Sequence, residues 1–188
     1  MTTMNGDITR AIELDTMEVQ GAEGRTLVAR LLRWDVENEV TDDGRSFYTE
    51  IWDRGSFANT IKRAEQSNRK WPMFLNHKRS EAPIGAVASI HERDDGPWMT
   101  AKLSNTSGGN DALELYRDGA LTSVSIGATV LRSRRVERAI HRMEVAVREV
   151  SMTPFNQLIG ADIMALRSHE AATSYLDELD EFLKNRKT

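Results

Sequence analysis

The fold depends most on two long strand candidates, which are Ala120–Leu131 (ALTSVSIGATVL) and Met143–Met152 (MEVAVREVSM). Both are rich in β-branched and aliphatic residues, which favour extended backbone. An arginine-rich connection lies between them. These two segments predict a fold in which strands dominate.

Further segments also have strand character. They are Thr26–Val36, Trp71–Leu75, Pro83–Glu92 and Trp98–Leu103. The last two are separated by Asp94-Asp95-Gly96, which is a strong signal for a β-hairpin.

Helices are expected at three places. Ser56 is positioned to cap a short helix from Phe57 to about Ala64, and Asn110 to cap a helix that stops at Gly119. In the tail an apolar stripe indicates an amphipathic helix at 169–188. The stripe consists of Tyr175, Leu176, Leu179, Phe182 and Leu183. The predicted class is α+β and β-rich, an antiparallel barrel with helices outside.

Composition narrows the function classes. The 188 residues suit one domain, and the 25 basic and 29 acidic side chains are well mixed, which argues against a nucleic-acid binder. The absence of cysteine excludes disulfides, thiol nucleophiles and cysteine-based zinc sites. Four histidines without His-Glu-x-x-His spacing give a metal or cofactor site little support. With no membrane-length apolar run and no signal-peptide pattern, the expected protein is soluble and intracellular.

Glu149 is the first candidate for chemistry. Strand periodicity places it on the same face as Met143, Val145 and Val147, so it continues an apolar face. A buried carboxylate there needs a partner. An arginine ion pair, or a strand end that reaches solvent, explains the pattern as well as a catalytic role does.

Ser123, Ser125 and Gly127 share one face of the other long strand. Small polar groups beside a glycine, which lets another backbone approach, suit a nucleophile in a cleft. Because exposed serines are common, the residues alone favour a solvent-facing strand with incidental serines.

His77 follows the apolar strand Trp71–Leu75 and precedes a polar loop. Histidine can act as a general base near neutral pH, although a loop histidine taken alone is usually a surface residue. His91, His141 and His169 are weaker candidates. Together, a hydroxyl, an imidazole and a carboxylate on separate elements supply what acyl transfer needs.

The order of several segments resembles the prohead (capsid maturation) proteases of tailed phages over about residues 27–166. The segments that carry the resemblance are Tyr48-Thr49-Glu50 with Gly55-Ser56-Phe57, Phe74-Leu75-Asn76-His77 with Pro83-Ile84-Gly85, Asp118-Gly119-Ala120-Leu121 leading to Ser125-Ile126-Gly127, and Glu149-Val150-Ser151. One departure follows the last block, where Met152-Thr153-Pro154 replaces a Pro-Ala-Asn-like stretch.

The resemblance implies an assemblin-like β-barrel wrapped by helices, and a Ser-His-carboxylate mechanism. His77 would be the general base, Ser125 the nucleophile and Glu149 the orienting carboxylate, with Ser123 as the competing nucleophile. Because herpesvirus assemblins use a second histidine as third member, His141 remains an outside candidate. Backbone N–H groups near Gly127, helped by Arg132, Arg134 or Arg135, could bind the oxyanion.

The residue patterns along the chain predict a polar N-terminal arm at 1–24, the protease domain at 25–168 and a C-terminal helix at 169–188. The resemblance also implies partners and a location. The major capsid protein or a scaffold protein would be the substrate, inside the assembling procapsid in the host cytoplasm. Self-cleavage and homodimer formation are open. The rival hypothesis is a non-catalytic assembly or scaffold-binding protein with the same barrel.

Overall fold

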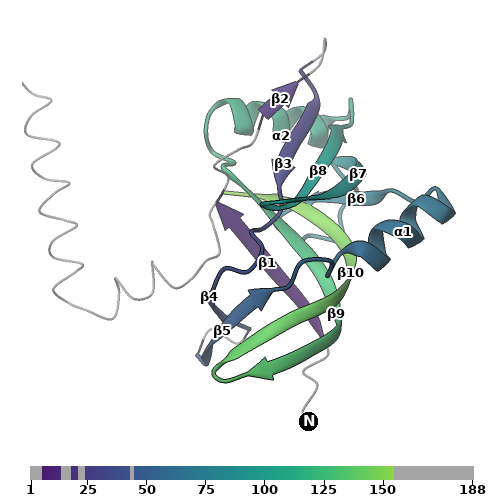
Figure 1. Cartoon of the computed structure of the whole chain (residues 1–188). Helices are drawn as coiled ribbons and strands as arrows, with labels where there is room; N and C mark the ends of the chain where they lie inside the picture. The colour runs from purple at the N-terminus through teal and green to yellow at the C-terminus, as the bar shows by residue number, and fades with distance from the viewer. Residues whose placement is uncertain (1–5, 14–17, 21–23, 43–44, 155–188) are drawn as a thin grey trace, which may run out of the picture.

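A computed structural model describes residues 6–13, 18–20, 24–42 and 45–154 of the chain. Ten strands and two helices lie in these ranges (Figure 1). The strands are β1 (Asp7–Glu13), β2 (Glu18–Gln20), β3 (Thr26–Arg30), β4 (Asn38–Thr41), β5 (Phe47–Trp52), β6 (Trp71–Leu75), β7 (Gly85–Arg93), β8 (Gly96–Leu103), β9 (Ser123–Val136) and β10 (Ala139–Thr153). The helices are α1 (Ala58–Ser67) and α2 (Ser107–Arg117).

All ten strands belong to one curled sheet in the order β1-β9-β10-β6-β7-β8-β3-β2, with β5 also pairing with β10 and β4 with β5 (Figure 1). The β-rich α+β class is confirmed. The expected all-antiparallel barrel is wrong, because β10 pairs in parallel with both β5 and β6. Within the described strands, β1 and β2 end the sheet path and do not pair with each other.

The sequence located most of these elements. β6 has the predicted bounds, and β7 and β8 form the predicted hairpin. The strand predicted at Thr26–Val36 is shorter, because the chain turns at Asp35, which has a φ of 56°. Residues 1–24, expected to be a polar arm, contain β1 and β2, and both pair within the sheet. The predicted helix at 169–188 lies outside the described residues.

Both predicted helix caps are wrong. The N-cap of α1 is Phe57, without a side-chain cap bond, and the Phe57 N–H donates to Glu92 Oε1 at 3.0 Å instead. The buried hydroxyl of Ser56 has no hydrogen-bond partner among the described residues. The N-cap of α2 is Thr106, which accepts the Gly109 N–H, so Asn110 lies inside the helix. The predicted stop at Gly119 is confirmed, with φ at 73° directly after the C-cap.

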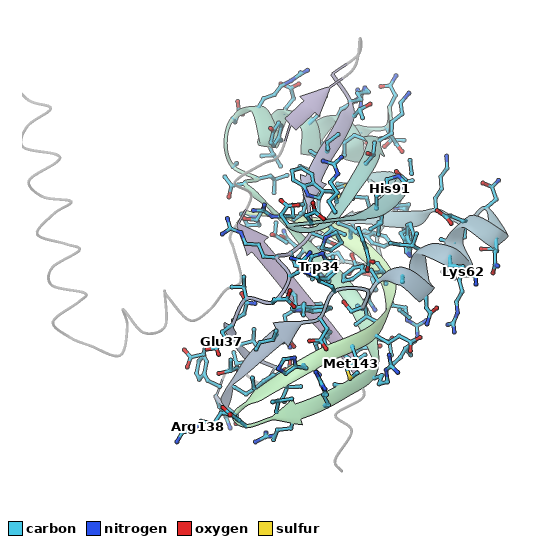
Figure 2. The ribbon with its side chains drawn as sticks, in the orientation of Figure 1. Trp34, Glu37, Lys62, His91, Arg138 and Met143 are labelled. Atoms are coloured by element: carbon cyan, nitrogen blue, oxygen red, sulfur yellow. The ribbon has the colours of Figure 1, made fainter. Side chains whose placement is uncertain are left out.

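The core fills the inside of the curled sheet. α1 packs on β7 and β10, and α2 packs beside β8. Trp34 lies in the interior, whereas Arg138 lies at the outer turn of the β9–β10 hairpin (Figure 2). The first half of β9 is therefore buried on both faces, and its second half extends into solvent.

A buried ion cluster ties the N-terminal strand to the centre of the sheet. Arg10 of β1 donates to both carboxylate oxygens of Glu50 in β5, at 2.7 and 3.0 Å, and Arg142 of β10 donates to Glu50 Oε2 at 2.6 Å. Tyr48 accepts a hydrogen bond from both guanidinium groups. Burial raises the pKa of the Tyr48 phenol to about 12. Glu50 is part of an early landmark block of the sequence, and its contacts are those of this ion cluster.

Candidate active site

His77 lies in the turn that follows β6. Since β6 runs parallel to β10, with Leu75 beside Met152, the turn places His77 over the last residues of β10. Asn76 and His77 both have left-handed backbone, with φ of 49° and 58°. Asn and His tolerate this region better than most residues do, and the Asn76 N–H is held by Met152 O at 3.0 Å.

Ser125 lies in β9, between Ala11 of β1 and Ser151 of β10. It is 1% exposed, so the solvent-facing strand favoured by the residues alone is wrong. Its Oγ is 2.7 Å from His77 Nε2. Ser123 is also buried, and it pairs with Thr153 of β10, whereas Ser125 pairs with Ser151.

Glu149 lies in β10 opposite Gly127 and is 1% exposed. The strand does not alternate strictly, because register shifts interrupt it, one of them between Val147 and Glu149. The period-2 argument for its face is therefore wrong, although its burial is confirmed. Its Oε1 is 2.7 Å from His77 Nδ1, and Arg79 NH2 lies 3.5 Å from the same oxygen.

One imidazole thus connects the other two side chains. A carboxylate can only accept, so His77 Nδ1–H donates to Glu149, and the neutral ring leaves Nε2 free to accept the Ser125 hydroxyl proton. Burial by itself raises the pKa of the Glu149 carboxyl group. Hydrogen bonds from His77 and Ser151 and the nearby Arg79 charge outweigh it, so that its pKa lies below its usual range.

Residues 12–174 match the model of a family described as caudovirus prohead serine protease. The chain belongs to this family. The resemblance found in the sequence is therefore confirmed.

Two known prohead and capsid proteases are similar to this family member. The prohead protease of Enterobacteria phage HK97 is 29% identical over 131 residues, which cover 65% of this chain and 55% of the relative. The chain thus spans about half the length of that relative. The bacteriophage T4 capsid assembly protease matches with a TM-score of 0.59 over 80% of this chain and 98% of its own, at 9% identity, which supports the fold alone.

The reason why position 127 is a glycine differs from the one expected from the sequence. A Cβ at this position would overlap the Glu149 carboxylate and the Arg79 guanidinium. The glycine therefore makes room for a charged side chain of the site, not for another backbone.

Two other expectations concern the site. His141 does not take the position of third member, because the partner of His77 Nδ1 is Glu149, and His141 Nδ1 pairs with Asp53 at 2.6 Å. Arg132, Arg134 and Arg135 lie in the exposed second half of β9, whereas Ser125 lies in its buried first half. Their help with an oxyanion stays a prediction.

The backbone N–H groups near Gly127 belong to a strand that is paired on both sides at Ser125–Gly127, by β1 and by β10. Their part in an oxyanion site stays a prediction. Arg79 is the guanidinium that lies beside Glu149 and Gly127. It was missed because nothing local in the sequence distinguishes it from Lys78.

Within the described residues, no group of three or more histidine, aspartate or glutamate side chains is arranged to hold a metal ion. None of the helices there has the length and apolar character needed to span a membrane.

Proposed function

We propose that the chain is a prohead maturation serine endopeptidase with His77, Ser125 and Glu149 as its catalytic triad. The observation that carries the proposal is the single imidazole held between Ser125 Oγ and Glu149 Oε1, at 2.7 Å to each. This is the geometry that general-base activation of a serine needs.

The reaction would follow from that geometry. His77 Nε2 takes the proton of Ser125 as Oγ attacks the scissile carbonyl, and Glu149 stabilises the imidazolium that forms. His77 then gives the proton to the leaving amine, and water hydrolyses the acyl-enzyme by the same route. His77 is 17% exposed and Ser125 only 1%, so the substrate approaches along the turn that carries His77.

The substrates proposed are the capsid or scaffold proteins of the same virus, cleaved inside the assembling procapsid in the host cytoplasm. Membership of the prohead protease family and the similarity to the HK97 relative support this choice.

Co-expression with the neighbouring capsid gene tests the proposal. Mass spectrometry of the assembled shell should find truncated capsid or scaffold protein with the wild-type chain and full-length protein with Ser125→Ala. Ser56→Ala, at a buried serine without a hydroxyl partner among the described residues, is the control and should behave like wild type. Equal truncation with Ser125→Ala would reject the proposal. Normal shells with no truncation in any sample would favour the non-catalytic assembly protein.

A further inference from the structure

We infer that Ser151 is a positioning residue of the proposed triad, because its hydroxyl holds the base and the carboxylate in register. Ser151 is completely buried in β10. Its Oγ is 2.7 Å from Glu149 Oε2, and the backbone N–H of His77 donates to the same Oγ at 3.2 Å. The inference rests on the proposed function and assigns Ser151 no contact with substrate.

The directions of these two hydrogen bonds are fixed by chemistry. A carboxylate can only accept and a backbone N–H can only donate, so Ser151 donates to Glu149 and accepts from His77. Each oxygen of Glu149 then has its own donor, Oε1 from His77 Nδ1 and Oε2 from Ser151. Both ends of the His77–Glu149 hydrogen bond are thereby anchored to one hydroxyl.

The backbone of His77 shows why an anchor is needed. A non-glycine residue with a φ of 58° is disfavoured, and the preceding Asn76 is left-handed as well. The turn persists because its N–H groups are held. Asn76 bonds to Met152 O and Lys78 to Leu75 O, both at 3.0 Å, and Ser151 supplies the acceptor for His77 itself.

The position of Ser151 follows from the sheet. Ser151 lies beside Ser125 of β9 on one side and beside Phe74 of β6 on the other. Phe74 in turn lies two residues before the turn that carries His77. A hydroxyl here is within reach of all three elements of the site. The alternative role is a merely structural one, in which a buried serine satisfies its neighbours without influencing the reactivity of Ser125.

Fluorophosphonate labelling separates the two roles. The second-order rate constant for labelling of the full chain should fall about 10- to 100-fold in Ser151→Ala, the size expected for loss of a hydrogen bond to a charged group. Ser151→Thr should restore most of the rate, and Ser151→Val, which has the shape of threonine without its hydroxyl, should not. Ser56→Ala is the matched buried control.

A second readout reports on the carboxylate directly. In a carbon-13 NMR titration, assigned with Glu149→Gln, Ser151→Ala should raise the pKa of the Glu149 carboxyl group, because the charged form loses a donor. Ser56→Ala should leave that titration unchanged.

The outcomes distinguish this inference from the proposed function. A wild-type chain that is never labelled rejects the proposed triad, and the positioning role falls with it. Labelling of wild type with equal rates for the threonine and valine variants overturns the inference alone, even if the alanine variant does not fold. An unchanged Glu149 titration in Ser151→Ala overturns it too.

Discussion

Two histidine–carboxylate pairs of nearly the same geometry lie in the part of the chain that the structure describes. His77 Nδ1 lies 2.7 Å from Glu149, and His141 Nδ1 lies 2.6 Å from Asp53. The two imidazoles are similarly accessible, at 17% and 19% exposure. Seen as isolated pairs, neither is the better candidate for catalysis.

Their surroundings separate them. The first pair has Ser125 Oγ at 2.7 Å from the far nitrogen of its ring, and the second has no such hydroxyl contact within the described part of the chain. Glu149 is 1% exposed, whereas Asp53 is 23% exposed. What distinguishes the His77 pair is therefore its third group and the burial of its carboxylate, not the histidine–carboxylate contact itself.

The largest difference is expected between the alanine variants of the two histidines. His77→Ala should lower the cleavage rate and the fluorophosphonate labelling rate by about 10⁵-fold or more, since members of a catalytic unit fail together. His141→Ala should stay within about threefold of wild type in both measurements. Equal losses in the two variants would break the distinction between the pairs.

Neutralising the two carboxylates should give the next largest difference. Glu149→Gln keeps the shape but loses the charge that stabilises the imidazolium, so the labelling rate should fall about 10³- to 10⁴-fold. Asp53→Asn, the matched change in the other pair, should have little effect on labelling. A larger loss in Asp53→Asn would mean that the wrong pair has been chosen.

The pH dependence of the free energy of unfolding gives a further test of the contacts of Glu149. Because the pKa of folded Glu149 lies below that of the unfolded chain, its ionised form stabilises the fold above the unfolded value, and this is lost as the pH falls through the folded pKa. At neutral pH, Glu149→Gln should lower the free energy of unfolding by about 1–3 kcal/mol. Denaturant titrations should show the gap to wild type narrowing in acid. A constant gap would contradict the assigned contacts.

The smallest effect is expected from the arginines beside the two pairs. Arg79 NH2 lies 3.5 Å from Glu149 and Arg134 NH2 lies 3.9 Å from Asp53, and both side chains are about half exposed. Arg79→Gln should slow labelling by no more than about fivefold, less so at high salt, because exposed ion pairs contribute little. Arg134→Gln should not change it. A salt-independent loss in Arg79→Gln would point to a direct role on the reacting atoms.

Much of the fold could be predicted from local sequence. The bounds of β6, the β7–β8 turn and the two long strands all carry residue patterns that act over a few positions. The parallel pairing of β10 with β5 and β6 could not, since such neighbours are far apart in sequence and leave no local pattern. That pairing is what brings the β6 turn to β10.

For the same reason, only some of the side chains of the site could be predicted. His77, Ser125 and Glu149 were chosen from the sequence and lie together, although their catalytic roles remain proposals. The contacts of Ser151 and Arg79 depend on a left-handed turn and an interrupted strand register, which composition does not encode. The local signal in the sequence that could have identified Ser151 is its position two residues after Glu149.

The central claim is that His77 activates Ser125, and mapping the fluorophosphonate adduct by peptide mass spectrometry tests it most directly. The account predicts one adduct, on the Ser125 side chain of the wild-type chain, that disappears in His77→Ala and persists in His141→Ala. An adduct on Ser123 or Ser151, no adduct at all, or an adduct on Ser125 that is indifferent to His77→Ala would contradict it.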